Sequence, residues 1–208
     1  MRKLFVGLVM VLMGLLLMTP IASAYPVEAG QYITVAQGIG GANSGGAFDI
    51  SQDQETLFDT FCVERNEYIT IGGTYYIGSI TASAIAGGLT GGSPDPLSSE
   101  AAYLYNQWVT GAIEKTIDNA NALQLAIWGF EGELGSLLLT GLAQTYINEA
   151  GEFADGSLYG IRVMNLLSGP RGALKQDMLV YGAVPEPATM LLLGLGLVGL
   201  AGLRKKFF

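Results

Sequence analysis

The spacing of apolar residues changes twice along the chain and predicts strands, then helices, then strands again. Before residue 85, short β-branched and aromatic runs are bounded by glycine, as in "GQYITVAQG" (30–38) and "GGTYYIGSITAS" (72–83). Such runs are typical of strands. A further strand is predicted from about Phe58 to Ile71. The glycine-rich "GIGGANSGG" (38–46) predicts a flexible loop.

After the glycine-rich linker "AGGLTGGSPDP" (86–96), the apolar period becomes that of a helix. Asp95 suits an N-cap and Pro96 the first helical position. Apolar residues at 101, 104, 105, 108 and 112 then fall on one helical face. A second helix follows, with Asp118 or Asn119 as its cap and apolar positions at 120, 123, 127 and 130. "GLAQTYINEAG" (141–151) predicts a third.

Two more strand-like runs, "SLYGIRVMNLL" (157–167) and "KQDMLVYGAV" (175–184), follow the helices. Strands on both sides of a central helical segment favour an α+β fold. The length suits a single domain over residues 25–183. We therefore expect one secreted α+β domain with additional segments at its two ends.

The N-terminal 24 residues have the composition of a cleavable signal peptide. Arg2 and Lys3 precede a long apolar run, which ends at the small residues of "ASA" (22–24). This order of charged, apolar and small residues predicts cleavage after Ala24. The alternative interpretation is an uncleaved membrane anchor.

The other end, residues 184–208, combines a short motif with an apolar run and a basic end. Pro185, Glu186 and Pro187 precede the largely apolar stretch 188–203, which "RKK" (204–206) follows. This order resembles the PEP-CTERM sorting signal of certain Gram-negative bacteria. The resemblance implies a transmembrane helix, processing by an exosortase-type membrane protease, and delivery to the cell surface or extracellular matrix. An ordinary tail anchor is the alternative.

Charge and composition narrow the function classes. Residues 25–184 contain five basic and seventeen acidic residues, a formal charge of −12. Such a charge disfavours binding to nucleic acid. The absence of histidine excludes Ser-His-Asp and Cys-His catalysis and histidine-ligated zinc. No spaced calcium-binding loop occurs, so neither a metal nor another cofactor is expected.

Cys62 is the only cysteine, and its surroundings form a second resemblance. "FCVE" (61–64) and "LQLAIW" (123–128) resemble the two signature segments of bacterial thioester domains, although Leu123 replaces the usual threonine. The resemblance implies an internal thioester between Cys62 and Gln124. Phe61 and Trp128 would then limit access of water.

Glu64 is two residues from Cys62, so on a strand both side chains would point to one face. This carboxylate is a candidate base toward an incoming nucleophile, and Tyr68 is a weaker candidate; a solvated carboxylate is the default interpretation. The thioester interpretation predicts an adhesive surface protein that attaches once to amines or hydroxyls of a target, without enzymatic turnover.

Three alternatives remain open. Cys62 could be an inert core cysteine in a non-covalent structural matrix protein. It could instead form an intermolecular disulfide, which export permits. A hydrolase would need a carboxylate pair drawn from Glu64, Glu131 and Glu133. Glu131 and Glu133 are two apart, so on a helix they would not face each other.

Overall fold

The computed structural model describes residues 25–43, 45–89, 91–135 and 137–182. Tyr25–Val184 form one compact unit. The expected signal peptide (1–24) and sorting segment (184–208) lie outside the described residues. Within the described ranges, no helix combines the length and the apolar character needed to cross a membrane.

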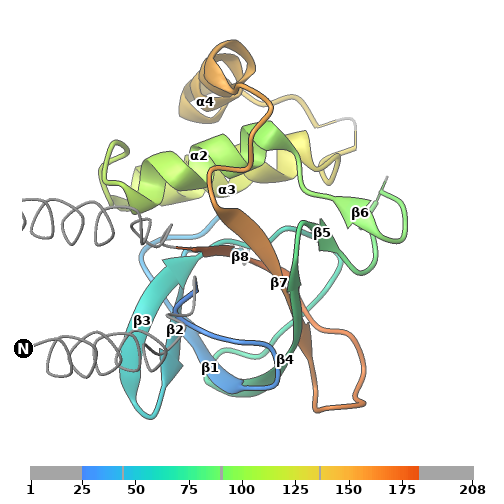
Figure 1. Cartoon of the computed structure of the whole chain (residues 1–208). Helices are drawn as coiled ribbons and strands as arrows, with labels where there is room; N and C mark the ends of the chain where they lie inside the picture. Colours follow the sequence, from blue (N-terminus) through green and yellow to red (C-terminus); the bar gives the residue numbers. More distant parts are fainter. Residues whose placement is uncertain (1–24, 44, 90, 136, 183–208) are drawn as a thin grey trace, which may run out of the picture. The chain divides into compact units, whose positions relative to one another are not determined.

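The described unit has a mixed sheet-plus-helix fold, in which strands precede and follow a helical segment (Figure 1). The elements before the helices are β1 (Tyr32–Gln37), β2 (Phe48–Gln52), β3 (Glu55–Thr60), β4 (Gly73–Thr81), β5 (Ser83–Ala84) and β6 (Asp95–Pro96). The elements that follow are α2 (Ser99–Val109), α3 (Ile117–Phe130), α4 (Gly141–Phe153), β7 (Ile161–Leu167) and β8 (Met178–Tyr181).

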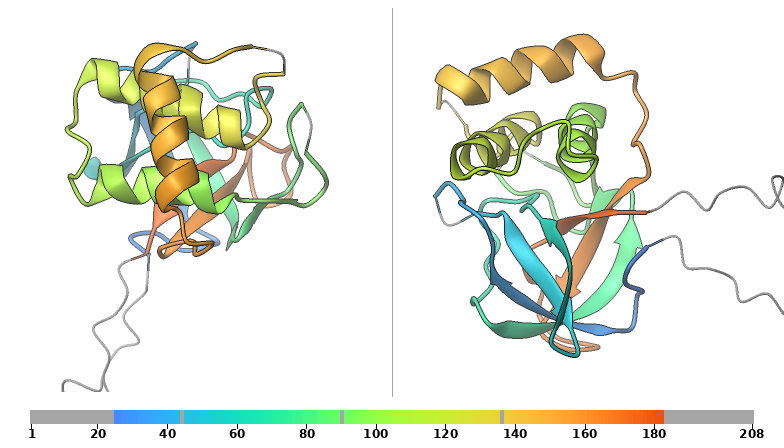
Figure 2. Two further views of the ribbon diagram at one scale, coloured as in Figure 1. Left: turned by 90° about the horizontal axis from the view of Figure 1, so that it is seen from above. Right: turned by 90° about the vertical axis from the view of Figure 1, so that its left-hand side faces the viewer.

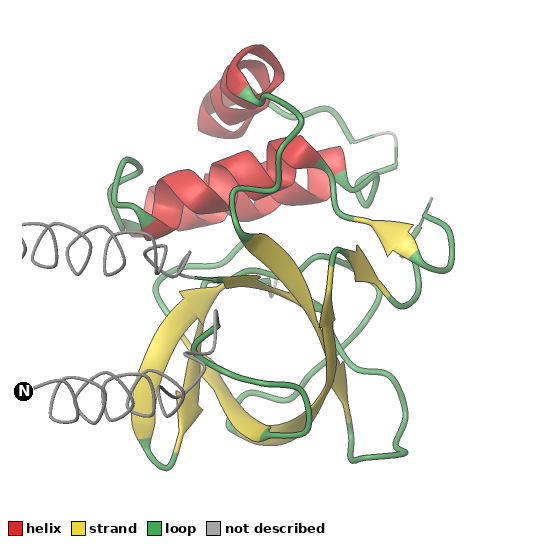
Figure 3. Ribbon diagram, in the orientation of Figure 1, coloured by secondary structure: helices red, strands yellow, loops and turns green. Residues whose placement is uncertain are grey.

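Six strands form one antiparallel sheet in the order β3-β2-β1-β4-β7-β8. The sheet curls until its two edges meet, as the ring of yellow strands in Figure 3 shows. The chain just after β3 pairs with β8 through a bridge between Cys62 and Met178. Hydrogen bonds from Leu179 N to Phe61 O (3.1 Å) and from Val63 N to Asp177 O (2.9 Å) complete this seam. The sheet is therefore closed into a barrel in which Cys62 lies at the seam.

The three helices form a layer beside the barrel, with α2 and α3 next to the sheet and α4 outside them (Figure 2). Helix α2 begins after Ser98, whose hydroxyl accepts a hydrogen bond from Ala101 N at 3.2 Å. Thr116 caps α3 in the same manner, through Asn119 N. These hydroxyls satisfy backbone donors that the first turn of a helix leaves unpaired.

The predicted element types are right, whereas several boundaries are wrong. Asp95 and Pro96 form β6 rather than the start of a helix, because Ser98 supplies the cap. The strand predicted over 58–71 instead spans Glu55–Thr60 and reaches Cys62 only as an isolated bridge. Strand β2 has no counterpart in the prediction, since it follows the glycine-rich run directly.

Two apolar cores occupy the two sides of the barrel wall. Along β7, Ile161 and Val163 pack toward the helices, whereas Met164 and Leu166 pack into the barrel. The same division holds after β3, where Phe61 belongs to the helix-side core and Cys62 to the barrel core. Because successive strand residues point to opposite faces, the barrel wall separates the side chains of these two neighbours.

Candidate functional site around Cys62 and Gln124

The structure brings Cys62 and Gln124 together across 62 residues of sequence. The Gln124 side-chain oxygen Oε1 accepts hydrogen bonds from the backbone N–H groups of Cys62 (3.0 Å) and Gly46 (2.9 Å). Its Nε2 donates to the Cys62 carbonyl oxygen at 3.0 Å. Gln124 is completely buried and Cys62 is almost so. The amide is therefore held between two backbone segments, with two N–H donors on its oxygen.

Three elements provide this arrangement. Cys62 is held at the barrel seam by its bridge to Met178, and Gln124 projects from the middle of α3. On α3, Leu123 and Ile127 pack in the helix-side core, whereas Trp128 packs in the barrel core with Cys62. Residues four apart lie on one helical face, so Gln124 and Trp128 both point toward the seam.

The loop between β1 and β2 is the third element, and it is packed closely against α3. Gly41 N donates to the Asn121 side-chain oxygen at 2.6 Å, and Gly46 N donates to Gln124. A side chain at Gly45 would begin 2.9 Å from Gln124 Cδ and 2.7 Å from Trp128 Cη2. Glycine at this position lets the backbone approach the amide carbon. The segment is a loop, as predicted, and its described glycines allow close packing against α3.

The sulfur of Cys62 is in an apolar, buried setting. Burial raises the pKa of the thiol to about 12, and the nearby Gly46 N–H only partly offsets this shift. The Gly46 N–H thus lies close to both the Gln124 oxygen and the Cys62 sulfur. At neutral pH the group is a thiol, and its proton must be transferred before or during any attack by sulfur.

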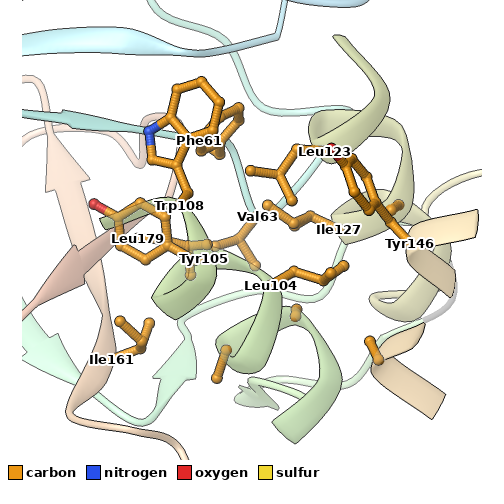
Figure 4. Close-up of a cluster of buried hydrophobic side chains, with 14 of the residues drawn as sticks. Phe61, Val63, Leu104, Tyr105, Trp108, Leu123, Ile127, Tyr146, Ile161 and Leu179 are labelled. Atoms are coloured by element: carbon orange, nitrogen blue, oxygen red, sulfur yellow. The ribbon is translucent and has the colours of Figure 1, made fainter. Parts of the chain in front are cut away.

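The two aromatic residues expected near Cys62 lie on different sides of the barrel wall. Phe61 packs edge-on against Tyr105 and Trp108, with ring centroids 6.2 and 5.1 Å apart (Figure 4). Trp128 packs in the barrel core with Cys62, and its Cη2 atom and the Gln124 side chain both lie beside Gly45. Of the two, only Trp128 is therefore on the same side of the barrel wall as Cys62.

Glu64 is fully buried, so the expectation of a solvated carboxylate at this position is wrong. Neither carboxylate oxygen has a hydrogen-bond partner among the described residues. Burial, followed by the negative charges of Glu133 and Asp95, raises the pKa of Glu64 to about 9. The nearby Gly88 N–H opposes this shift in part, although it does not make a hydrogen bond to either carboxylate oxygen. Glu64 thus holds a proton at neutral pH, and this state does not suit a general base.

Other carboxylates lie near Glu64, and Glu131 and Glu133 among them accept hydrogen bonds from the protein. Glu133 accepts hydrogen bonds from Arg65 N (2.9 Å) and Leu89 N (2.7 Å). Burial raises the pKa of Glu131 to about 7, while Ser98 donates to it from both N and Oγ. Burial, with the charge of Glu67, raises the pKa of Asp177 to about 8. Glu131 and Glu133 both follow the end of α3, so the helical-spacing argument does not apply to them.

The sequence interpretation missed two groups in this region. Gly46 supplies the second N–H to Gln124, and only its place in a glycine pair hinted at a close backbone approach. The second group is the buried carboxylate cluster: Glu64, Glu131 and Glu133 were considered only as a possible hydrolase pair and Asp177 not at all, because the four come from three separate parts of the chain that no local pattern connects. Tyr68, the weaker candidate base, is 74% exposed. Within the described part of the chain, no three His, Cys, Asp or Glu side chains are arranged to hold a metal ion.

Comparison with known proteins concerns the C-terminal end. A family model for the PEP-CTERM protein-sorting motif matches residues 183–206, which include Pro185, Glu186 and Pro187. No curated protein and no solved structure shows significant similarity to the chain. The motif implies processing by an exosortase at the membrane. The chain thus carries a PEP-CTERM sorting signal, which implies export, transient membrane anchoring and delivery to the cell surface.

Proposed function

We propose that the domain forms an internal thioester between Cys62 and Gln124 and uses it once to attach covalently to a surface target. The observation that carries this proposal is the pair of N–H groups, from Gly46 and Cys62, on the Gln124 oxygen. Attack by sulfur on Cδ places negative charge on that oxygen. Preorganised donors at 2.9 and 3.0 Å are suited to stabilise it.

The proposed step exchanges one bond for another. The Cys62 Sγ–Cδ bond forms, the Gln124 Cδ–Nε2 bond breaks, and the thiol proton leaves with nitrogen as ammonia. Because the thiol pKa is about 12, we propose that the proton passes from sulfur to nitrogen as the bonds change, without a free thiolate. Fixed positioning of the two groups lowers the barrier of such a reaction by about 7–11 kcal/mol.

The thioester would then react with an amine or hydroxyl of a target. The target becomes acylated by the Gln124 side chain, and Cys62 is released as a thiol. Each molecule reacts once, so the protein would be an adhesin or matrix attachment protein rather than an enzyme. In this proposal an exosortase of a Gram-negative cell processes the tail, and the target is a protein or polymer of a surface or matrix.

The intact mass of the purified protein, measured beside Cys62→Ala and Gln124→Met, tests the proposal. We expect the parent to be lighter than its processed sequence by one ammonia, and both variants to have their full mass. Methylamine should add its own mass to the parent and leave one thiol that can be alkylated. A parent of full mass, with Cys62 available for alkylation after unfolding, would contradict the thioester.

A non-covalent structural matrix protein is the second candidate. The burial that raises the thiol pKa to about 12 also suits an inert core cysteine. The fully hydrogen-bonded Gln124 would then only join α3 to the barrel. This candidate predicts that Cys62→Ala leaves surface attachment unchanged, whereas the thioester predicts that attachment is lost.

A further inference from the structure

The amide carbon of Gln124 is closed off from solvent on every described side. Gln124 is 0% exposed, Cys62 2% and Trp128 2%. Gly45 lies beside both the Gln124 side chain and the Cη2 end of Trp128, so close that a side chain at this position would clash with both. A target nucleophile must therefore displace part of this cover to reach the carbon.

A hollow of about 260 Å³ lies close to this cover. It is lined by Arg65, Asn66, Tyr68 and Leu89. Arg65 is three residues after Cys62, and its guanidinium carbon lies 5.9 Å from the centroid of the Trp128 ring. One face of Trp128 thus lies toward a wall of the hollow, while its Cη2 atom lies beside Gly45, which also adjoins Gln124.

A single residue fixes the walls of the hollow relative to Trp128. The Glu133 carboxylate accepts hydrogen bonds from Arg65 N and Leu89 N, which belong to opposite segments of the lining. The Glu133 backbone N–H donates to the Trp128 carbonyl oxygen at 2.8 Å. The hollow and the end of α3 are therefore one hydrogen-bonded unit.

Buried polar groups without partners also lie in this region. Both carboxylate oxygens of Glu64 and the indole Nε1 of Trp128 lack a hydrogen-bond partner among the described residues. Leaving such groups unpaired costs about 1–3 kcal/mol each. Each of these groups could therefore accept or donate a hydrogen bond to a polar group that reaches it.

We propose that the hollow lined by Arg65, Asn66, Tyr68 and Leu89 is the entrance for the target nucleophile and that Trp128 is the gate between this entrance and Gln124. The inference rests on the proposed thioester. The entrance admits a single projecting side chain or substituent, because its volume is only about 260 Å³. Trp128 sets the size of the group that passes.

The test compares a tryptophan placed in the entrance with one placed elsewhere. Leu89→Trp fills the entrance, and Leu89 is 54% exposed, so the change is compatible with folding. Leu138→Trp is the matched control, because Leu138 is 86% exposed and lines a second hollow of about 240 Å³ near the end of α3. The probes are methylamine and the bulkier benzylamine, and the readout is the rate at which the thioester mass disappears.

We expect Leu89→Trp to slow the reaction of the thioester with benzylamine by about tenfold and its reaction with methylamine by less. Leu138→Trp should react with both amines at the rates of the parent. Trp128→Phe, which shortens the gate, should accelerate both amines and bring their rates closer together. Equal rates in parent and Leu89→Trp, or slowing confined to Leu138→Trp, would overturn the inference.

A second readout separates failure of the entrance from failure of the thioester. If the parent mass shows no loss of ammonia, the thioester proposal fails, and the same variants are then treated with iodoacetamide in the folded state. Because Cys62 lies beyond the same gate, Leu89→Trp should still slow its alkylation relative to Leu138→Trp. An unchanged alkylation rate in Leu89→Trp would contradict the entrance independently of the thioester.

Discussion

Gln124 and Glu64 are equally buried polar side chains beside Cys62, and their surroundings differ completely. The Gln124 amide makes three hydrogen bonds to the backbone, whereas the Glu64 carboxyl makes none within the described residues. A satisfied buried amide joins the segments around it, because its loss would leave backbone groups unpaired. An unsatisfied carboxyl only adds a desolvation cost, which it reduces by retaining its proton.

Burial alone therefore does not reveal what a polar side chain contributes to the fold. Gln124 connects α3, the barrel seam and the β1–β2 loop at one point. The negative charges of Glu133, Asp95 and Asp177 each favour the neutral form of Glu64. The same substitution at the two positions should therefore change stability in opposite directions.

The largest effect is expected for Gln124→Met, made in a Cys62→Ala background so that no thioester contributes. Methionine fills a similar volume but leaves Cys62 N, Gly46 N and Cys62 O unpaired. Three unpaired backbone groups should lower the free energy of unfolding by about 3–5 kcal/mol. Urea unfolding of the double variant and of Cys62→Ala measures this difference. A loss below 1 kcal/mol, with Gln144→Met as the half-exposed control, would contradict the role assigned to the amide.

The pH dependence of stability should reveal the raised pKa values of the buried carboxyl groups. Glu64, Asp177 and Glu131 have folded pKa values of about 9, 8 and 7, all above their values in the unfolded chain. The folded state therefore binds more protons, and stability is lost as pH rises through these values. We expect the free energy of unfolding to fall by at least about 2 kcal/mol between pH 5 and pH 9. Urea midpoints that rise or stay level between pH 5 and pH 9 would contradict the raised pKa values of these three carboxyl groups.

Glu64→Met should act in the opposite direction from Gln124→Met. Replacing an unpaired buried carboxyl with an apolar side chain of similar length should be neutral or stabilise by about 1–2 kcal/mol at pH 7. The gain should increase at pH 9, where ionisation of the parent costs most. Denaturation at both pH values tests this, and a destabilisation above 1 kcal/mol would show that Glu64 has a partner in the folded protein.

The smallest effect is expected for Ser98→Ala, which concerns a carboxylate that has partners. This change removes the N-cap of α2 and the hydroxyl donor of Glu131 and should cost about 1 kcal/mol. Because the Ser98 hydroxyl lowers the Glu131 pKa, its loss should raise that pKa further. Ser98→Thr retains both hydrogen bonds and is the control. If the two variants lose equal free energy of unfolding, the loss comes from changed packing at residue 98 and not from the hydrogen bonds.

Local pattern was sufficient for the types of the main elements but not for their ends. The spacing at 101, 104, 105 and 108 identified the buried face of α2, because helical geometry repeats along the chain. Ala112 lies beyond the end of that helix and is exposed, since α2 ends at Val109. Strand β3 ends at Thr60 because the chain there turns to the barrel seam, a long-range pairing that no local run records.

For the candidate site, the amino-acid sequence was sufficient to identify the paired segments around Cys62 and Gln124, the absence of histidine and the sorting end. These are properties of short segments or of composition, so they are visible without coordinates. The folded structure was needed to establish that Gly46 completes the donor pair, that Phe61 faces away from Cys62, and that Glu64 is buried near other carboxylates. Each depends on barrel closure and on the packing of α3 across it, which bring together residues separated by 60 or more positions.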